Sequence, residues 1–508
     1  MKPPPNFPLT TLLTLMLASA GCIVGPHYKR PSASAPPAFK EQPPVNFKEA
    51  EAAGWKQSQP GDAYSKGRWW ELYNDSALNA LEEQVSVSNQ NVLQAEAQYR
   101  QAKAAVSVAR AALFPIVTTA PAITEAGGAA AGNNSGASGS RTSFNLPFNV
   151  SWEPDLWGNI RRGVTASTEN AQSLAAYVAN ARLLYQAELA QDYFGLHGND
   201  GEAELLTSTE TSYKEYLKLT QDRFSAGVAS DLDVAQAESQ LYQVQSQLID
   251  LGVQRAAFEH AIAILIGKPP AELTIPPVPL TTSPPPLPVG LPSELLERRP
   301  DIAGAERQVA AANEQIGIAI AAFYPTLSLT GSAGLESSSL AKWFTWPSRF
   351  WSVGPQLAET LFDAGRRRGV VAEQQAAYDA TVAAYRETVL TAMQQVEDNL
   401  AALRILAREA DKVQQTVQAA NRALEVSSAQ YRAGTAGYLT VITSQATLLS
   451  AEVTAVTLLT RRLAASVLLI EGLGGGWNAS QLPTTQNIPT PQPPPDFFGE
   501  GSQARQGS

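Results

Sequence analysis

The sequence predicts a mainly α-helical chain, built as two copies of one plan, that contributes four β-strands to a membrane β-barrel. Two glycine turns with similar flanking residues, at Gly227 and Gly434, lie 207 residues apart, and each stands between two long helical patterns. A heptad seam of apolar and small residues runs from Leu78 to Leu113. Over 144–153 the pattern changes to a period of two, which is typical of a strand with one apolar and one polar face. These observations predict long coiled-coil helical hairpins joined to short strands.

The composition excludes several classes of protein. The chain has 508 residues, of which 44% are hydrophobic, and a net charge of −10. It can therefore bury a large core, and it shows no basic aromatic patch of the kind that binds nucleic acid. Its single cysteine, Cys22, excludes an internal disulfide and a cysteine-based metal cluster. Its three histidines belong to no catalytic motif, so we expect neither an enzyme nor a bound cofactor.

Residues 1–21 are interpreted as a lipoprotein signal peptide. The apolar stretch from Phe7 to Ala20 is too short to cross a membrane as a helix, and small residues precede Cys22. This order is similar to a bacterial lipobox, whose cysteine is acylated, although Ser19 stands where that pattern usually has leucine. An ordinary signal peptide with a nearby cysteine is the alternative. The proline-rich residues 22–75 are expected to form an acylated, extended arm, and no later apolar run is long enough for a transmembrane helix.

The first structural repeat is expected at 76–268, in the order helix, β-hairpin, helix and helical hairpin. The glycine-rich stretch 195–201 is expected to break its second helix. The expected elements are a continuous helix at 78–113, strands at 116–124 and 144–153, a helix from 157 to 194, and a helical hairpin around Gly227.

The same order returns in the second half of the chain. Ten prolines make 269–292 a linker, and the second repeat is expected at 293–475. Phe323-Tyr324-Pro325 stands 210 residues after Leu113-Phe114-Pro115, and a glycine followed by paired arginines occurs in both halves. The tail at 476–508 is rich in proline, glutamine and glycine, so we expect it to be disordered.

The strands of one chain cannot form a barrel alone. Each half supplies two strands, and the open edge of a four-stranded sheet cannot lie in lipid. Because the smallest usual membrane barrels have about eight strands, several chains must share one barrel. Two chains would give eight strands and three would give twelve, and this count does not choose between them. The alternative is a soluble helical bundle with two surface hairpins.

Five stretches, in this order along the chain, carry a resemblance to a known family. The sequence resembles the TolC/OprM-type outer-membrane factor family, and most of all the lipoprotein channels of tripartite RND-type efflux systems. The stretches are Gly21–Pro31, Trp69–Asp75, Trp152–Arg162, Leu291–Ala303 and Leu361–Arg366.

The resemblance implies a homotrimer, with a twelve-stranded barrel in the outer membrane of a Gram-negative bacterium and an α-helical barrel across the periplasm. It implies a passive exit duct for drugs or other small molecules, joined by a periplasmic membrane-fusion adaptor to an inner-membrane RND-type transporter. Acylated Cys22 would anchor the duct in outer-membrane lipid. The alternative is a lipid-anchored coiled-coil scaffold of the envelope, without channel activity.

The resemblance also assigns roles to the two glycine turns. It implies adaptor docking at both turns and a pore constriction just after them. A simpler interpretation is that the glycines end helices and that Asp231 and Asp233 cap the next helix. Threonines in the second turn stand where relatives commonly carry a carboxylate, and a threonine ring would attract cations less strongly. The docking residues are Arg223, Gly227, Asp231, Tyr431, Arg432 and Gly434, and the constriction residues are Asp231, Asp233, Thr440 and Thr443.

Clustered arginines follow the second strand of each half. At the junction between strand and helix they are expected to reach the inner lipid surface with their charged ends. These membrane-junction residues are Arg161, Arg162, Arg366, Arg367 and Arg368.

Overall fold

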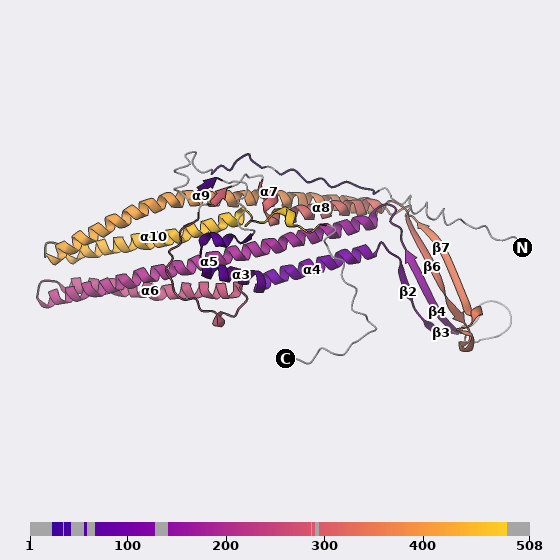
Figure 1. The fold of residues 1–508 in the computed structure, drawn as a ribbon, viewed down its shortest axis with the longest axis horizontal. Helices are drawn as coiled ribbons and strands as arrows, with labels where there is room; N and C mark the ends of the chain where they lie inside the picture. Colours follow the sequence, from indigo (N-terminus) through magenta and orange to yellow (C-terminus); the bar gives the residue numbers. More distant parts are fainter. Residues whose placement is uncertain are drawn as a thin grey trace.

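The structure is a computed structural model in which a long helical bundle carries a small β-sheet at one end (Figure 1). Cys22 and the predicted signal peptide lie outside the described residues, as does the tail from residue 485. The structure describes residues 23–33, 35–41, 55–57, 67–127, 141–285, 287–289 and 294–484.

Two antiparallel helical hairpins lie side by side and point away from the sheet (Figure 1). In the first, α5 (Asn159–Ser225) returns as α6 (Asp231–Leu265); in the second, α9 (Arg366–Arg432) returns as α10 (Tyr438–Gly472). Both long helices have 67 residues and both return helices have 35, so the predicted duplication is confirmed. The other α-helices are α3 (Ser76–Ser88), α4 (Gln90–Ala111), α7 (Leu295–Arg298) and α8 (Pro300–Ala321).

The prediction of one continuous helix over 78–113 is wrong at Asn89. Asp75 caps α3 as expected, but Asn89 leaves the helical conformation and its side chain accepts hydrogen bonds from the first amides of α4. The amide group of Asn89 also donates to the Leu265 carbonyl at 2.8 Å, and the Ser88 hydroxyl donates to the Ile266 carbonyl at 2.7 Å. The end of α6 therefore docks at the break: the Asn89 side-chain oxygen caps α4, while its amide group and the Ser88 hydroxyl satisfy the last carbonyls of α6.

The predicted break at 195–201 is also wrong, because α5 passes through this stretch without interruption. A Cβ atom on Gly195 would lie 2.7 Å from the ring of Phe258 in α6, and one on Gly198 would overlap the hydroxyl of Thr460 in α10. These glycines are needed for close helix packing, not for a turn. Burial against two neighbouring helices outweighs the roughly 1 kcal/mol by which glycine disfavours a helix interior.

The sheet is antiparallel, with β4 and β6 at its centre. Both β2 and β3 pair with β4 at one edge, where Pro121 separates them, and β7 forms the other edge. A proline at an edge removes no hydrogen bond from within the sheet. The strands are β2 (Ile116–Thr119), β3 (Ala122–Ala126), β4 (Arg141–Trp152), β6 (Thr326–Ser337) and β7 (Arg349–Ala358).

The two faces of the sheet differ in polarity. Directly opposed residues in an antiparallel sheet share a face. One row across the strands reads Val117, Val150, Gly331 and Val353, and the next row on that face reads Thr119, Phe148, Ala333 and Trp351. The row between them, on the other face, reads Thr118, Asn149, Ser332 and Ser352. The predicted alternation is confirmed, and it gives one mainly apolar face and one face that is polar and uncharged in this central row.

The main hydrophobic core lies in the middle of the bundle, where both hairpins, α3 and α8 meet. Trp69 of η2 (Trp69–Tyr73) is fully buried there, and Tyr73 packs on Phe194 with ring centres 4.9 Å apart. Among the described residues, α10 alone is long and apolar enough to cross a membrane by length and composition. A buried core helix meets the same criterion, and α10 packs along α9 and α5.

The linker and the tail contain more structure than expected. The linker includes η3 (Pro270–Glu272) and β5 (Leu287–Val289), and β5 pairs in parallel with β1 (Trp55–Gln57) of the arm. The prediction of disorder is wrong for the start of the tail, because residues 476–484 are ordered around η7 (Ala479–Gln481). Gln172 of α5 donates to the Pro483 carbonyl at 2.9 Å and so holds this segment on the bundle.

Candidate functional site

The two predicted glycine turns form the ends of the helical hairpins farthest from the sheet (Figure 1). Gly227 has φ of +69° and Gly434 has φ of +75°, a region that other residues rarely adopt. The amide of Val228 donates to the Arg223 carbonyl at 2.9 Å, and the amide of Thr435 donates to the Gln430 carbonyl at 3.0 Å. These bonds close the ends of α5 and α9, so the expected helix-ending role of both glycines is confirmed.

The two return helices begin differently. Ser230 and Asp233 form a capping box, in which each side chain binds the other residue's backbone amide. The side chain of Asp233 is therefore used in capping, while Asp231 is exposed in the first turn of α6. In the second hairpin, Gly437 occupies the N-cap position and supplies no side chain. The two tips thus share a turn but not a cap.

Arg223 connects the first hairpin to the second. Its Nη1 donates to the Tyr431 carbonyl at 2.8 Å, and its guanidinium carbon lies 4.6 Å from the centre of the Tyr431 ring. The Tyr431 hydroxyl lies 3.2 Å from that of Thr220, and Tyr216 is hydrogen-bonded to Ser428 at 2.5 Å. Residues that were predicted as two separate docking tips are therefore joined within one chain.

Buried tyrosines form the core beneath this contact. Tyr431 and Tyr438 are 3% and 2% exposed, and their ring centres lie 5.3 Å apart. Burial, followed by the neighbouring Tyr431, raises the pKa of Tyr438 above its ordinary value, so its hydroxyl stays protonated. Tyr438 was not predicted as a site residue, although its aromatic side chain directly after the Gly437 cap was a visible signal.

The second tip has uncharged threonines at the predicted constriction positions. Thr440 and Thr443 are both exposed. The Thr443 hydroxyl donates to the Leu439 carbonyl at 2.9 Å within its own helix, which leaves its methyl group outward. Thr443 lines a groove of about 640 Å³ between α9 and α10. Of the two aspartates predicted at the constriction, Asp233 is used in the helix cap and Asp231 is not.

Large apolar side chains are exposed at the tips. The solvent-exposed fractions are 46% for Phe224, 65% for both Val228 and Leu232, and 63% for Leu439. Arg432 is exposed beside them. An apolar surface at a tip that also carries exposed charged residues is suited to protein contact.

At the opposite ends of α5 and α9, ion pairs hold the change from strand to helix. Arg161 binds Asp155, with 3.0 Å between Nε and Oδ2, and Arg367 binds Asp363 at 2.6 Å. The hydrogen bond from Arg367 lowers the pKa of Asp363 below its ordinary value. The two aspartates were missed in the sequence, where a carboxylate a few residues before each arginine pair was the available signal.

The five predicted junction arginines have different surroundings. Arg366 and Arg368 are exposed, whereas Arg162 is only 3% exposed. Its Nη1 pairs with Glu314 of α8 at 2.6 Å, and its other nitrogens donate to the carbonyls of Val24 and Pro26 at 2.8 and 3.0 Å. Arg162 therefore fastens the N-terminal arm to the bundle and does not reach a lipid surface.

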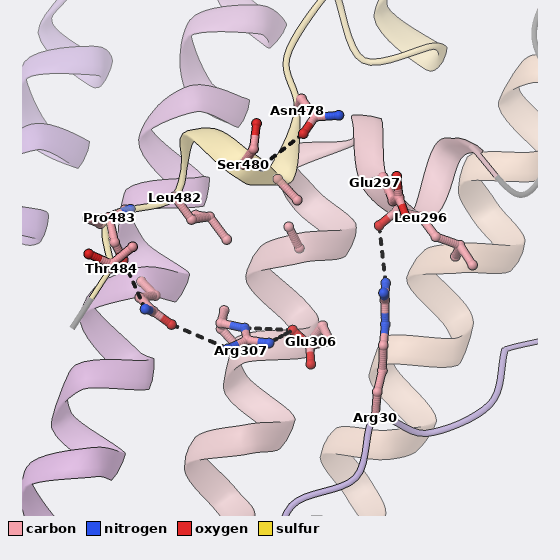
Figure 2. Close-up of a pocket in the computed structure, with 13 residues that line it drawn as sticks. Arg30, Leu296, Glu297, Glu306, Arg307, Asn478, Ser480, Leu482, Pro483 and Thr484 are labelled. Carbon is pink, nitrogen blue, oxygen red and sulfur yellow. Dashed lines mark hydrogen bonds and ion pairs between the residues drawn. The ribbon is translucent and has the colours of Figure 1, made fainter. Parts of the chain in front are cut away.

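A polar cavity of about 480 Å³ lies where the arm crosses the bundle, and Figure 2 shows its lining. Arg307 pairs with Glu306 and, at 2.9 Å, with Glu169, while Arg30 donates to the Leu296 carbonyl at 3.1 Å. The Arg307 guanidinium is thus paired within the chain. Within the described part of the chain, no group of three or more histidine, cysteine or acidic residues could hold a metal ion.

Comparisons with known proteins cover most of the chain. A family model described as outer membrane efflux protein matches residues 81–268 and 291–475. The chain is 31% identical to outer membrane protein OprJ of Pseudomonas aeruginosa, with 93% of this chain and 97% of OprJ covered. It is 29% identical to the toluene efflux pump outer membrane protein TtgF of Pseudomonas putida, with 94% and 98% covered. The solved structure of the outer-membrane channel OprN superposes with a TM-score of 0.82 at 28% identity, with 90% of this chain and all of that chain covered.

Proposed function

The chain belongs to the outer membrane efflux protein family, and we propose that three copies of it close into one channel with twelve strands and a helical tube. As a member of this family it is an outer-membrane protein of a Gram-negative bacterium and the exit duct of a tripartite efflux pump. The family is one of channels and not of enzymes.

The polarity of the sheet carries this proposal. An open sheet edge cannot lie in lipid, and the sheet of one chain ends in two edges, at β2/β3 and at β7. Pairing β7 of one copy with β2/β3 of the next removes every edge. The apolar face, with Trp351 and Val353 exposed by 78% and 79%, would then meet lipid. The polar face would line a water-filled pore, and strands of 10 to 12 residues are long enough to cross the membrane.

The helices supply the periplasmic part of the duct. At 1.5 Å per residue, the 67 residues of α5 and of α9 extend about 100 Å from the sheet. The middle of the sheet's polar face is uncharged, with Asn149, Ser332 and Ser352. This composition supports a passive duct whose walls add little substrate specificity, so that the partner pump selects what is exported.

We infer that the hairpin tips bind a periplasmic adaptor, through which an inner-membrane RND-type transporter is reached. The exposed Phe224, Val228, Leu232 and Leu439 support an apolar docking surface. Gly434→Pro should abolish drug resistance while the trimer still assembles, because proline cannot adopt φ of +75°. Lys412→Pro, which is equally disruptive to the middle of α9, should instead lower the yield of trimer. Loss of the trimer in Gly434→Pro would make the tip a folding element and contradict docking.

The experiment that tests the channel is mass determination of the oligomer in detergent together with single-channel conductance in a planar bilayer. A trimer with a small, rarely opening conductance is the expected result. Thr443→Asp should then raise cation selectivity, since it adds a carboxylate to the tip. A monomer without conductance would contradict the channel, and it would favour a lipid-anchored coiled-coil scaffold instead.

A further inference from the structure

The loop between β6 and β7 exposes apolar and cationic side chains together. It lies at the end of the sheet away from the helices (Figure 1). Leu340, Phe344 and Trp346 are 62%, 70% and 77% exposed, and Lys342 and Arg349 are exposed among them. No acidic residue occurs from 337 to 349. A loop that met only water would not need three large apolar side chains at its surface.

The loop is held in this shape by its own hydrogen bonds. The Lys342 carbonyl accepts hydrogen bonds from the hydroxyls of Thr345 and Ser348, at 2.7 and 2.5 Å. The indole nitrogen of Trp343 donates to the Leu335 carbonyl at 3.3 Å, and its ring packs on Phe144 of β4 with centres 5.5 Å apart. Trp343 therefore fixes the loop to the sheet, and the exposed residues are preorganised and lose little entropy on binding.

Arg349 and Trp346 form one unit within the loop. The Arg349 guanidinium stacks over the indole of Trp346, and its Nε donates to the Trp346 carbonyl at 3.1 Å. Within the described residues no hydrogen bond or ion pair uses the remaining guanidinium nitrogens, and such a fork suits the oxygens of a phosphate. Lys342, held at the first turn of the loop, adds a second positive charge.

We propose that this loop, defined by residues 337–349, binds a phosphorylated lipid headgroup in the outer leaflet of the outer membrane. Phe344 and Trp346 would enter the interfacial layer, as aromatic side chains do at the rim of a membrane barrel, and Lys342 and Arg349 would contact the phosphates. The exposed Trp351 and Val353 of β7 continue the loop's apolar surface toward the membrane interior. The proposal rests on the sheet crossing the outer membrane with this loop at its outer end.

The test uses the full chain in a neutral detergent and a fluorescent, diphosphorylated lipid A as the probe. The double variant Lys342→Gln/Arg349→Gln should weaken binding by roughly thirtyfold, because each cation close to an anionic lipid surface contributes a factor of about five. Trp346→Ala should weaken it as well, and added salt should weaken lipid binding by the wild-type protein more than binding by the double loop variant. The matched control is Lys412→Gln/Arg422→Gln, which removes two exposed cations from α9 and should leave the Kd unchanged.

Three results would overturn the proposal: a Kd unchanged in the loop variant, an equal loss in the α9 control, or equally tight binding of the same lipid without its phosphates. The last would leave the loop as an apolar anchor alone. Conductance separates this proposal from the proposed function, since the loop variant should keep wild-type conductance. A protein that binds the lipid but never conducts would contradict the channel and not the lipid site.

Discussion

Removing the guanidinium of Arg223 should make the channel open more often. The structure joins the two hairpins of one chain at this residue, through a 2.8 Å hydrogen bond to the Tyr431 carbonyl and a stacking contact with the Tyr431 ring. A hydrogen bond from a charged group contributes about 1.5 kcal/mol at the low end, which is appropriate for a half-buried side chain. Stacking over an aromatic ring at a partly exposed site adds about 0.5 kcal/mol. The contact is therefore worth about 2 kcal/mol.

If the hairpins separate when the tip opens, that energy is lost only in the open state. Arg223→Gln should then raise the ratio of open to closed channels roughly thirtyfold. The assay is the open probability of single channels in a planar bilayer, with the trimer checked by mass. Arg223→Lys keeps the charge but not the planar stack, so we expect an intermediate increase. Lys218→Gln removes an exposed charge of the same helix and should change nothing. An unchanged open probability in an intact Arg223→Gln trimer would refute the idea that this contact differs between the two states.

Three further predictions concern the bundle. Arg162→Met breaks the buried ion pair with Glu314 and removes the donors to the Val24 and Pro26 carbonyls, so it should cost about 3 kcal/mol and expose the arm to limited proteolysis. Gly198→Ala should lower the thermal stability strongly because its Cβ would overlap the Thr460 hydroxyl. Gly201→Ala should be tolerated, because its Cβ would have its nearest neighbour 3.6 Å away. Equal effects of the two substitutions would contradict the packing argument. Burial raises the pKa of Glu471 from 4.5 to about 7, and ionisation of such a group opposes folding. Its contribution should therefore be lost as the pH rises from about 4.5 through about 7, and Glu471→Gln should be more heat-stable than the wild type at pH 8 but not at pH 4.

The features that could be predicted from the sequence depend on local order. The turns at Gly227 and Gly434 follow from backbone conformation alone, and the strand at 144–153 follows from a period of two that needs no partner. The break at Asn89 could not be predicted with equal certainty, because the heptad pattern continues through it. What stabilises the break is the docked end of α6, whose Leu265 carbonyl binds Asn89 from 176 residues away in the chain.

The errors share one physical cause. Gly195 and Gly198 have the local signature of a helix end, yet their function is to admit Phe258 and Thr460 at short range. In the same way, neither Arg223 nor Tyr431 carries a signal that it contacts the other. Local propensity amounts to about 1 kcal/mol per residue, and tertiary contacts in a packed bundle exceed it. Packing between distant segments was therefore the part of the fold and of the tip that required the structure.

The unequal caps of the two return helices have a mechanical consequence. The Ser230–Asp233 capping box makes the start of α6 resist unwinding, and such a cap is worth about 1 kcal/mol. The start of α10, behind Gly437, lacks that support from a side chain. Each chain would then contain one stiffer hairpin, α5/α6, and one more flexible hairpin, α9/α10. In a ring of three chains, the stiffer and the more flexible hairpins would alternate. A force applied evenly around the tip end of the helical tube would then bend the α9/α10 hairpins first.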